Sequence, residues 1–504
     1  IPCARWRFSS RFSIDPWYTS PPMDILFAAT ELAPYAKVAG LAEFVASLSK
    51  TLRQLGHHVT IALPRFPHFE RAGLLVARRL TPLAFQLGTD SFEVTVFDGR
   101  LPSGVDITLL EVPGCFDREG IYGAGDEDYP DNDMRFALFS RAVVALLLSR
   151  MRAGSPFGIV HLHDWPTSLV PLFGKRLGNQ DLEECTKFVL TLHDLTHQGL
   201  SDASKLDQLG IGGDLFHPDG VEFYGKINIL KAGILFSDAM TTVSETYARE
   251  ILKSPHGRGL EGVLSAHKNK LTGIINGIDY SIWNPTIDPH LPSRFSGQDP
   301  SQKTQCKGRL LQELGLALRA QRPLLAFAGT LHEQNGIDLL LDALPEIMRC
   351  DVGLVVAGHG TGAINARLEE AARKWKDDFV FLSSPSDPML HRIFGGADIV
   401  LVPSRFEPCG VYQRYAHRYG AVPVVHATGG LIDTVVDCDA TLETGSGFVF
   451  DEPTAQSLVS AVQRAVASYA LPGWARLRKR VMNLDLGWDR SAHRYLEIYR
   501  SLLR

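Results

Sequence analysis

Histidine and aspartate side chains suited to sugar chemistry follow two predicted β-strands in the first half of the chain. His163 and Asp164 come shortly after the apolar run at 158–161, and His193 follows the run at 187–191. Parallel strands bring their carboxyl ends to one edge of a sheet, so we expect these residues at one site. There they can hydrogen-bond sugar hydroxyls, but the same spacing is compatible with a metal pair or a capped turn.

A lysine and a glycine occupy the first strand–helix connection. Lys37 and Gly40 lie between a predicted strand at 25–29 and a predicted helix at 43–55. An ammonium group and backbone N–H groups in such a place can bind an anion. The alternative is a solvated loop lysine followed by a glycine that caps the helix.

A carboxylate and a second glycine loop stand at comparable places in the second half. Glu407 and Pro408 follow a predicted strand at 399–403, which puts the carboxylate beside the free N–H groups of a helix's first turn. An N-terminal helix cap is the alternative role for Glu407. Thr428 and Gly429 open a loop that can approach a phosphate or a sugar closely.

The elements that position these residues alternate between strand and helix. Short apolar runs are separated by amphipathic stretches from 25 to 243 and again from 323 to 426. This pattern is typical of parallel sheets with helices on both faces. A segment rich in Pro, Ser, Asp and Gly at 287–302 separates the two halves. We therefore predict an α/β fold with two doubly wound, Rossmann-like domains that face a central cleft.

The predicted boundaries are 23–290 for the N-terminal domain and 291–504 for the C-terminal domain, whose last helix crosses back. Residues 1–22 are rich in Arg and Ser and contain no acidic residue before Asp15. That composition is compatible with an upstream translated leader or with an organelle transit peptide. We expect a cytoplasmic protein in the first case and a plastid protein in the second.

Composition places the chain among globular enzymes. Of 504 residues, 45% are hydrophobic and 21% are charged, with a net charge of −5. These values exclude a disordered tail and a disulfide-rich mini-domain, and they give no global attraction to nucleic acid. The seven cysteines include no C-x-x-C pair, so we expect neither a disulfide framework nor a zinc site. No uncharged apolar run reaches the roughly 18 to 20 residues of a membrane helix.

Together these motifs make the chain similar to the glycogen and starch synthases, which elongate α-1,4-glucan from a nucleotide sugar. The resemblance extends from Met23 to the C-terminus. It rests on segments 37–43, 163–165, 191–194, 198–199, 238–244, 257–260, 275–279, 283–285, 403–410, 419–420 and 429–435, and on Trp488. It implies the GT-B fold, in which the second domain holds most of the donor and the first holds most of the acceptor glucan.

The resemblance also implies roles for individual residues. Glu407 matches the family glutamate at the donor glucose, His193 the histidine beside the reacting sugar, and Asp164 an acid in the wall of the first domain. The implied donor-binding residues are Lys37, Gly40, Asn276, Cys409, Gly410, Thr428 and Gly429. The family retains the anomeric configuration and uses no metal. The expected partners are α-glucan and ADP-glucose, with UDP-glucose also open, and no cofactor, nucleic acid or membrane; no motif indicates an oligomeric state.

Four positions depart from the family pattern on the donor side. Thr330 and Asn335 replace the Arg and Lys that neutralise the diphosphate, and Pro385 replaces the tyrosine that stacks on the nucleotide. The family's double glycine is Ala39-Gly40. Removing one electrostatic stabiliser commonly costs about 10²- to 10³-fold in rate.

Two hypotheses therefore follow. The first is an active glucosyltransferase that makes α-1,4-glucan from ADP-glucose, which the acceptor-side motifs and Glu407 favour. The second is a degenerate synthase that binds glucan or a partner synthase with little or no turnover, which Thr330 and Asn335 favour.

Overall fold

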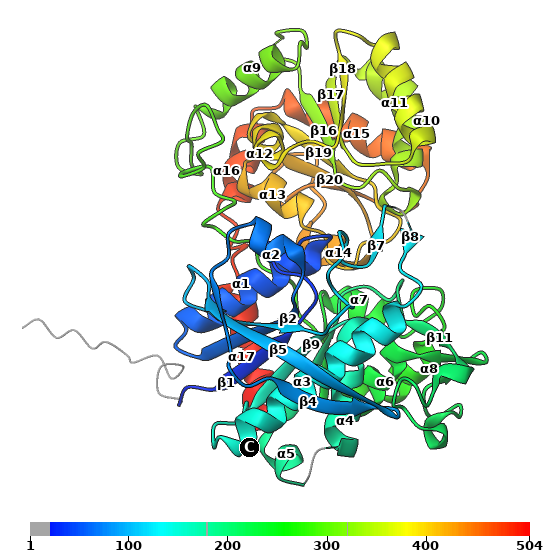
Figure 1. Cartoon of the computed structure of the whole chain (residues 1–504). Helices are drawn as coiled ribbons and strands as arrows, with labels where there is room; N and C mark the ends of the chain where they lie inside the picture. The colour runs from blue at the N-terminus through cyan, green and yellow to red at the C-terminus, as the bar shows by residue number, and fades with distance from the viewer. Residues whose placement is uncertain (1–20, 126, 178–179, 320) are drawn as a thin grey trace, which may run out of the picture.

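The computed structural model describes residues 21–504 apart from 126, 178–179 and 320, and it has two lobes (Figure 1). The lower lobe in that view holds the N-terminal part of the chain and the upper lobe the C-terminal part. The predicted leader at 1–22 lies outside the described residues except for its last two. Within the described part, no helix combines the length and apolarity needed to cross a membrane.

A ten-stranded sheet forms the centre of the N-terminal lobe. Its parallel part has the order β15-β14-β10-β9-β1-β2-β6. The inner strands are covered on both faces, and for this reason they are continuous apolar runs in the sequence. The parallel strands are β1 (Asp24–Ala28), β2 (His58–Pro64), β6 (Asp106–Glu111), β9 (Ile159–His163), β10 (Lys187–Leu192), β14 (Ala239–Thr242) and β15 (Leu271–Gly273).

Antiparallel strands extend this sheet at one edge, and two small sheets lie apart from it. β5 pairs antiparallel with β6, and β3 and β4 pair with β5. The strand–helix rhythm of the sequence does not predict these strands, because hairpin strands at a half-exposed edge lack the long apolar run of a buried strand. They are β3 (Val76–Arg78), β4 (Leu83–Leu87) and β5 (Asp90–Arg100), with β7 (Gly123–Ala124), β8 (Glu127–Asp128), β11 (Leu200–Asp202), β12 (Glu222–Phe223) and β13 (Lys226–Asn228) in the small sheets.

Helices connect the parallel strands and bury one apolar face each. In the first of them, α1, the buried residues Phe44, Leu48 and Leu52 recur at helical spacing, as the sequence predicted. The helices of this lobe are α1 (Gly40–Gln54), α2 (Pro67–Arg71), α3 (Asn132–Arg152), α4 (Leu169–Leu177), α5 (Gln180–Cys185), α6 (Ile229–Phe236), α7 (Glu245–Glu250) and α8 (Glu261–Ala266).

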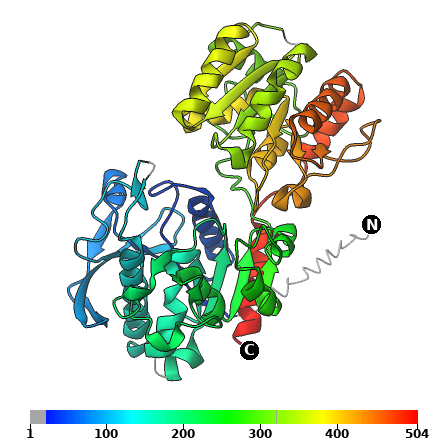
Figure 2. The ribbon, with the colours of Figure 1, turned by 90° about the vertical axis from the view of Figure 1, so that its right-hand side faces the viewer.

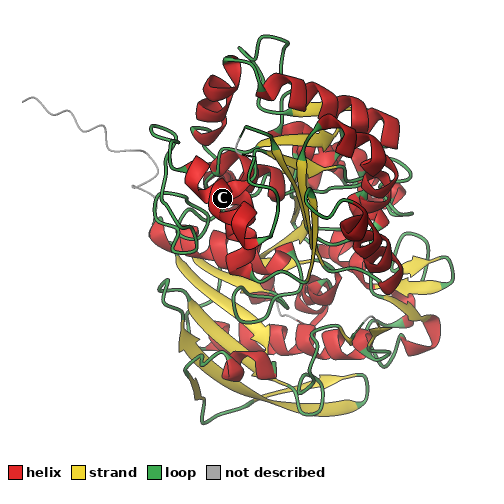
Figure 3. Ribbon diagram, turned by 90° about the horizontal axis from the view of Figure 1, so that it is seen from above, coloured by secondary structure: helices red, strands yellow, loops and turns green. Residues whose placement is uncertain are grey.

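A six-stranded sheet of entirely parallel strands forms the C-terminal lobe, with helices on both sides (Figure 3). The strand order is β18-β17-β16-β19-β20-β21, so the direction of winding reverses between β16 and β19. Ligands of doubly wound sheets bind outside the carboxyl ends of the strands at such a switch point. The strands are β16 (Leu324–Ala328), β17 (Gly353–Gly358), β18 (Phe379–Ser383), β19 (Ile399–Val402), β20 (Val422–His426) and β21 (Phe448–Phe450).

The helices of the C-terminal lobe include one that returns to the other lobe. The last helix, α17, packs against α1, and Tyr499 Oη lies 2.7 Å from His161 Nδ1 (Figure 2). The helices are α9 (Lys303–Glu313), α10 (Ile337–Ile347), α11 (Gly362–Lys374), α12 (Asp387–Gly396), α13 (Tyr412–Arg418), α14 (Gly429–Thr434), α15 (Ala455–Tyr469), α16 (Gly473–Met482) and α17 (Asp489–Leu502).

Two neighbouring segments carry the chain between the lobes. The backbone N–H of Ile278 on the outgoing segment donates to the carbonyl of Leu486 on the returning one at 2.8 Å. A Cβ on Gly277 would lie 2.5 Å from Cα of Trp488, so only glycine allows these segments to touch there. The α/β fold with two parallel-sheet, Rossmann-like domains is confirmed, while the boundary at residues 290 and 291 stays a prediction.

Candidate active site between the two domains

Asp164 follows β9 and holds the segment after β10 in place. Its Oδ1 accepts a hydrogen bond of 2.7 Å from the backbone N–H of His193. Its own backbone has a φ of 51°, which few residues other than glycine adopt. Burial raises the pKa of Asp164 well above its usual value, although the N–H of His193 opposes the shift. Asp164 is therefore placed to position His193.

The imidazole of His193 is half-buried among other rings. Its edge packs on Phe44 with ring centroids 4.6 Å apart, and its Nε2 lies 3.2 Å from Nδ1 of His163. Burial lowers the pKa of His193 to about 3. The ring is neutral at physiological pH, so it can hydrogen-bond a sugar hydroxyl but cannot neutralise a phosphate.

The loop that carries Lys37 is held by a buried acid. The Glu31 carboxylate accepts hydrogen bonds from the backbone N–H groups of Val38 at 2.7 Å and Ala39 at 2.8 Å. Lys37 Nζ lies 2.9 Å from Glu43, with 44% of its side chain exposed. An exposed ion pair is worth only about 0–1 kcal/mol, so an incoming anion can take Lys37 from Glu43 at low cost. Glu31 had no role in the sequence-based prediction, although it lies three residues after the end of β1.

Glu407 stands after β19 on the facing side of the junction. Its Oε2 accepts a hydrogen bond of 3.0 Å from Ser404 Oγ, and its carboxylate also accepts the N–H of Gly410. Burial raises the pKa of Glu407 to about 7, and the charge of Asp194 in the N-terminal domain adds to the shift. Asp194 lies after β10, so a charge of the N-terminal domain acts on Glu407.

The predicted glycines differ in whether the backbone requires them. A Cβ on Gly429 would lie 2.1 Å from the carbonyl oxygen of Glu407, and the residue has a φ of +44°. Gly410 also has a positive φ, of 68°. A Cβ on Gly40, by contrast, meets nothing within 4 Å. Gly410 and Gly429 therefore shape the backbone around Glu407, whereas Gly40 has no such steric role.

The remaining predicted residues also come to this junction. Cys409 is buried, which raises the pKa of its thiol to about 11, and the backbone N–H of Asn276 donates to its sulfur. A thiol with that pKa is protonated at neutral pH and is a poor nucleophile. Thr428 is buried directly before α14. The Asn276 Oδ1 atom is buried and has no hydrogen-bond partner among the described residues.

Hydrogen bonds across the junction involve residues to which the sequence assigned no role. Asp433 of α14 accepts from Ser244 Oγ at 2.8 Å and from Thr246, through the backbone N–H at 2.9 Å and Oγ1 at 2.6 Å. The N–H of Gly429 donates to Glu250 at 3.1 Å. Ser244 and Asp433 lie within the motifs that carry the family resemblance, which was the available signal.

Phe406, the neighbour of Glu407, also packs against the N-terminal domain. Its ring meets Tyr247 edge to face at 5.4 Å and stacks with His256 at 5.8 Å. The Arg258 guanidinium lies 5.5 Å from the same ring. The two domains therefore contact each other directly beside Glu407.

Thr330 and Asn335 lie on the loop from β16 to α10, as the sequence register implies. Thr330 is exposed and Asn335 is half-buried. The loop is fixed by a hydrogen bond of 2.8 Å from the N–H of Arg405 to the carbonyl of Gln334. Pro385 lies on the loop after β18 and is half-buried.

Two basic side chains next to this loop already have partners. Arg405 donates to a carboxylate oxygen of Asp338 and to the carbonyl of Pro453. The His332 ring accepts the N–H of Gln334 at 3.1 Å. The donor-side loop therefore offers no unengaged cation of its own.

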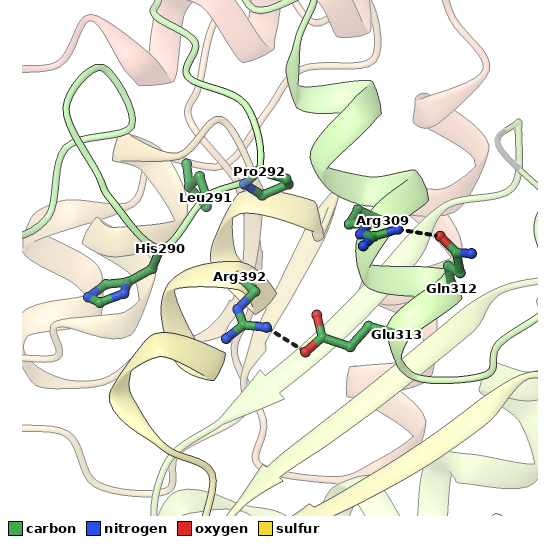
Figure 4. Close-up of a pocket in the computed structure, with 7 residues that line it drawn as sticks. All are labelled: His290, Leu291, Pro292, Arg309, Gln312, Glu313 and Arg392. Carbon is green, nitrogen blue, oxygen red and sulfur yellow. Dashed lines mark hydrogen bonds and ion pairs between the residues drawn. The ribbon is translucent and has the colours of Figure 1, made fainter.

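A separate pocket of about 540 Å³ lies on the flank of the C-terminal domain (Figure 4). It is bounded by the connection at 290–292, by α9 and by Arg392 of α12. Its two arginines have partners, since Arg392 pairs with Glu313 and Arg309 with Gln312. None of the predicted site residues lines this pocket. Among the described residues, no three His, Cys, Asp or Glu side chains are grouped as a metal site requires.

Two facing Rossmann-like domains with these residues at their junction define a glycosyltransferase of the GT-B class. Residues 24–266 match the family model of the starch synthase catalytic domain, and residues 315–481 match that of the group 1 glycosyl transferases. A glycogen synthase 2 of Geobacter metallireducens is 39% identical over 95% of this chain and 99% of its own. A glycogen synthase of Thioalkalivibrio sulfidiphilus is 40% identical over 95% of this chain and 100% of its own. The chain belongs to the glycogen and starch synthase family.

Solved structures agree with this assignment. The catalytic domain of starch synthase IV from Arabidopsis thaliana, bound to ADP and acarbose, is 32% identical over 96% of this chain and 100% of its own, with a TM-score of 0.88. A sucrose-phosphate synthase of Thermosynechococcus elongatus has a TM-score of 0.58, at 16% identity over 95% of this chain and 99% of its own. The second likeness shows the fold alone.

Proposed function

We propose that this chain transfers glucose from ADP-glucose to the end of an α-1,4-glucan with retention of configuration. The observation that carries the proposal is the contact of the Glu407 segment with the N-terminal domain, through Phe406 on Tyr247, at the junction of two domains whose relatives are glycogen synthases. ADP and acarbose bound to the Arabidopsis catalytic domain support a nucleotide and a glucan as the ligands of the same region.

The catalytic roles follow from the charge states of the two residues. Glu407, as a carboxylate, accepts hydrogen bonds from the donor glucose and stabilises the positive charge that develops on the sugar ring. His193 stays neutral and hydrogen-bonds a hydroxyl of the same sugar. Asp164 acts on the reaction only by holding the His193 segment.

Stabilisation of the leaving diphosphate comes from the chain and needs no metal in this proposal. Lys37 is the best placed cation, because its ion pair with Glu43 is exposed and readily exchanged. Asn276, Cys409, Gly410, Thr428 and Gly429 complete the donor side, and Gly40 stays a prediction because no contact supports it. The cytoplasmic location also stays a prediction.

The second candidate function is glucan binding with little or no turnover. It is favoured by Thr330 and Asn335, because neither side chain places a positive charge on the loop after β16. It is also favoured by Asp338, whose carboxylate already pairs with Arg405.

Transfer of radiolabelled glucose from ADP-glucose to glycogen by the purified chain tests the first function. We expect incorporation that falls at least about 10²-fold in Glu407→Gln, which keeps the shape of the residue and removes its charge. An unchanged melting temperature of the variant shows that folding is intact. Retention of the chain on glycogen without any incorporation at saturating ADP-glucose would establish the second function instead.

A further inference from the structure

The ring of Tyr412 covers the end of β16 at the point where the C-terminal sheet reverses its winding. Gly329 directly follows β16, and its φ is +139°. The three atoms nearest to a Cβ built on Gly329 all belong to the Tyr412 ring, at 3.0, 3.6 and 3.7 Å. A glycine at a switch point usually lets a ligand approach the backbone closely. Here Gly329 accommodates a tyrosine ring instead.

Neighbouring aromatic residues hold the ring in this position. Phe394 of α12 lies parallel to it at an interplanar angle of 11°, with centroids 6.1 Å apart. Tyr415, one helical turn along α13, meets it edge to face at 6.2 Å. Contacts between rings in these geometries are favourable by about 0.5–1.5 kcal/mol each beyond their buried area. Such contacts favour the observed rotamer without fixing it permanently.

Charged residues of both domains act on the phenol of Tyr412. Burial raises the pKa of Tyr412 to about 12, and the charges of Glu407, Asp387 and Glu43 add to the shift. Glu43 is the partner of Lys37 in the N-terminal domain, so charges of both domains act on the phenol. Within the part of the chain that the structure describes, its hydroxyl forms no hydrogen bond. The ring is therefore held by packing alone and not by a hydrogen bond of its hydroxyl.

We propose that the ring of Tyr412 occludes the position of the donor diphosphate. ADP-glucose then binds only when the ring rotates away. This inference rests on the proposed function, because it assumes a nucleotide diphosphate as the ligand beside the loop at 329–336. A ligand that binds only the open rotamer has its affinity reduced by the fraction of molecules in that rotamer. The glucan side of the site is unaffected.

Binding of ADP alone, measured by titration calorimetry, tests the inference without requiring turnover. Tyr412→Ala removes the ring, and Tyr412→Phe is the matched control that keeps the ring and removes only the hydroxyl. We expect Tyr412→Ala to bind ADP at least about tenfold more tightly than the unaltered chain. A tenfold change corresponds to a ring that covers the site in about nine-tenths of the molecules. Tyr412→Phe is expected to bind like the unaltered chain. Retention on a glycogen affinity gel is expected to be equal for all three proteins.

Two results would overturn the inference. Weaker ADP binding by both variants would mean that the Tyr412 hydroxyl contacts the phosphates and that the ring does not exclude them. Equal ADP binding by the two variants and the unaltered chain, or no ADP binding by any of them, would mean that the ring does not control access of the diphosphate to the site. Tyr412→Thr replaces Tyr412→Ala if the alanine variant does not fold. Glucose transfer by the unaltered chain is measured separately, so loss of the proposed function and loss of this inference are distinguishable.

Discussion

At the scale of single residues, the proposed sugar-binding residues Glu407 and His193 are present, while the two loop positions proposed to lie beside the diphosphate are uncharged. Glu407 and His193 have charge states suited to binding a glucosyl unit with partial positive charge. Thr330 and Asn335 contribute no charge, and Arg405 nearby is bound to Asp338. The rate of glucose transfer should therefore depend strongly on positive charge added to the loop between β16 and α10.

Restoring both cations is the direct test of that dependence. Thr330→Arg together with Asn335→Lys should raise kcat/KM for ADP-glucose by about 10²-fold or more, because each preorganised cation stabilises the leaving diphosphate. Steady-state kinetics of glucose transfer measure the effect. Thr361→Arg, on the loop after β17, is the control for nonspecific charge. An unchanged rate in the double variant would show that Lys37 or Arg405 already supplies the stabilisation.

The pH dependence of transfer should report the ionisation of Glu407. Its pKa is raised to about 7 by burial, so the carboxylate form prevails only above that pH. Because the carboxylate is the active form, kcat/KM should increase with pH below about 7 and level off above it. His193, with a pKa of about 3, contributes no change in this range. A profile that is flat from pH 5 to 8, or one that Glu407→Gln leaves in place, would contradict this assignment.

At the scale of elements, the strand-end loops hold the site residues through their backbones. Glu31 holds the loop before α1, and Gly429 allows the start of α14 to touch the carbonyl of Glu407. These loops lie at the carboxyl ends of buried strands, as expected in a doubly wound fold.

Substitution of Gly429 should therefore disturb both stability and the site. Gly429→Ala puts a Cβ 2.1 Å from the carbonyl oxygen of Glu407 at a positive φ, so we expect a loss of about 1–3 kcal/mol in the free energy of unfolding. Denaturant unfolding measures it. Gly40→Ala is the matched control, because its Cβ meets no atom within 4 Å and alanine favours the start of α1. Equal stability of the two variants would refute the steric argument.

The sequence predicted the elements that carry the site better than it predicted those around it. The strand before Lys37 and the helix with Phe44 at its buried face were expected, because parallel strands and amphipathic helices have distinct periodicities. The antiparallel strands β3 to β5 were not, since their alternation is weak and half-exposed. Glu31 and Tyr412 were not recognised either, because a side chain's contact with a distant loop leaves no local pattern.

At the scale of the whole molecule, the two domains are joined by contacts on both sides of Glu407. Phe406 packs against Tyr247, and Asp433 bonds to Ser244 and Thr246. The hydrogen bonds of Asp433 link α14 to the start of α7, while the segments that cross between the lobes touch at Gly277 and Trp488. These contacts hold the two domains together beside Glu407.

Loss of Asp433 should open the molecule. Asp433→Ala removes three hydrogen bonds across the junction, and bonds to a charged acceptor are worth about 1.5–3 kcal/mol each. We expect a larger radius of gyration by small-angle X-ray scattering and at least about a tenfold lower rate of transfer. Asp437→Ala is the matched control, because Asp437 pairs with Arg464 inside the C-terminal domain. An unchanged scattering curve for Asp433→Ala would show that other contacts hold the domains closed.

We expect the chain to extend α-1,4-glucan with retention although Thr330 and Asn335 carry no charge. The most direct measurement is the NMR spectrum of maltooligosaccharide incubated with the purified chain and ADP-glucose labelled with ¹³C at the anomeric carbon. We expect a labelled signal from a new α-1,4 linkage, which is absent with Glu407→Gln. A labelled β linkage, or no labelled linkage at saturating donor, would contradict it.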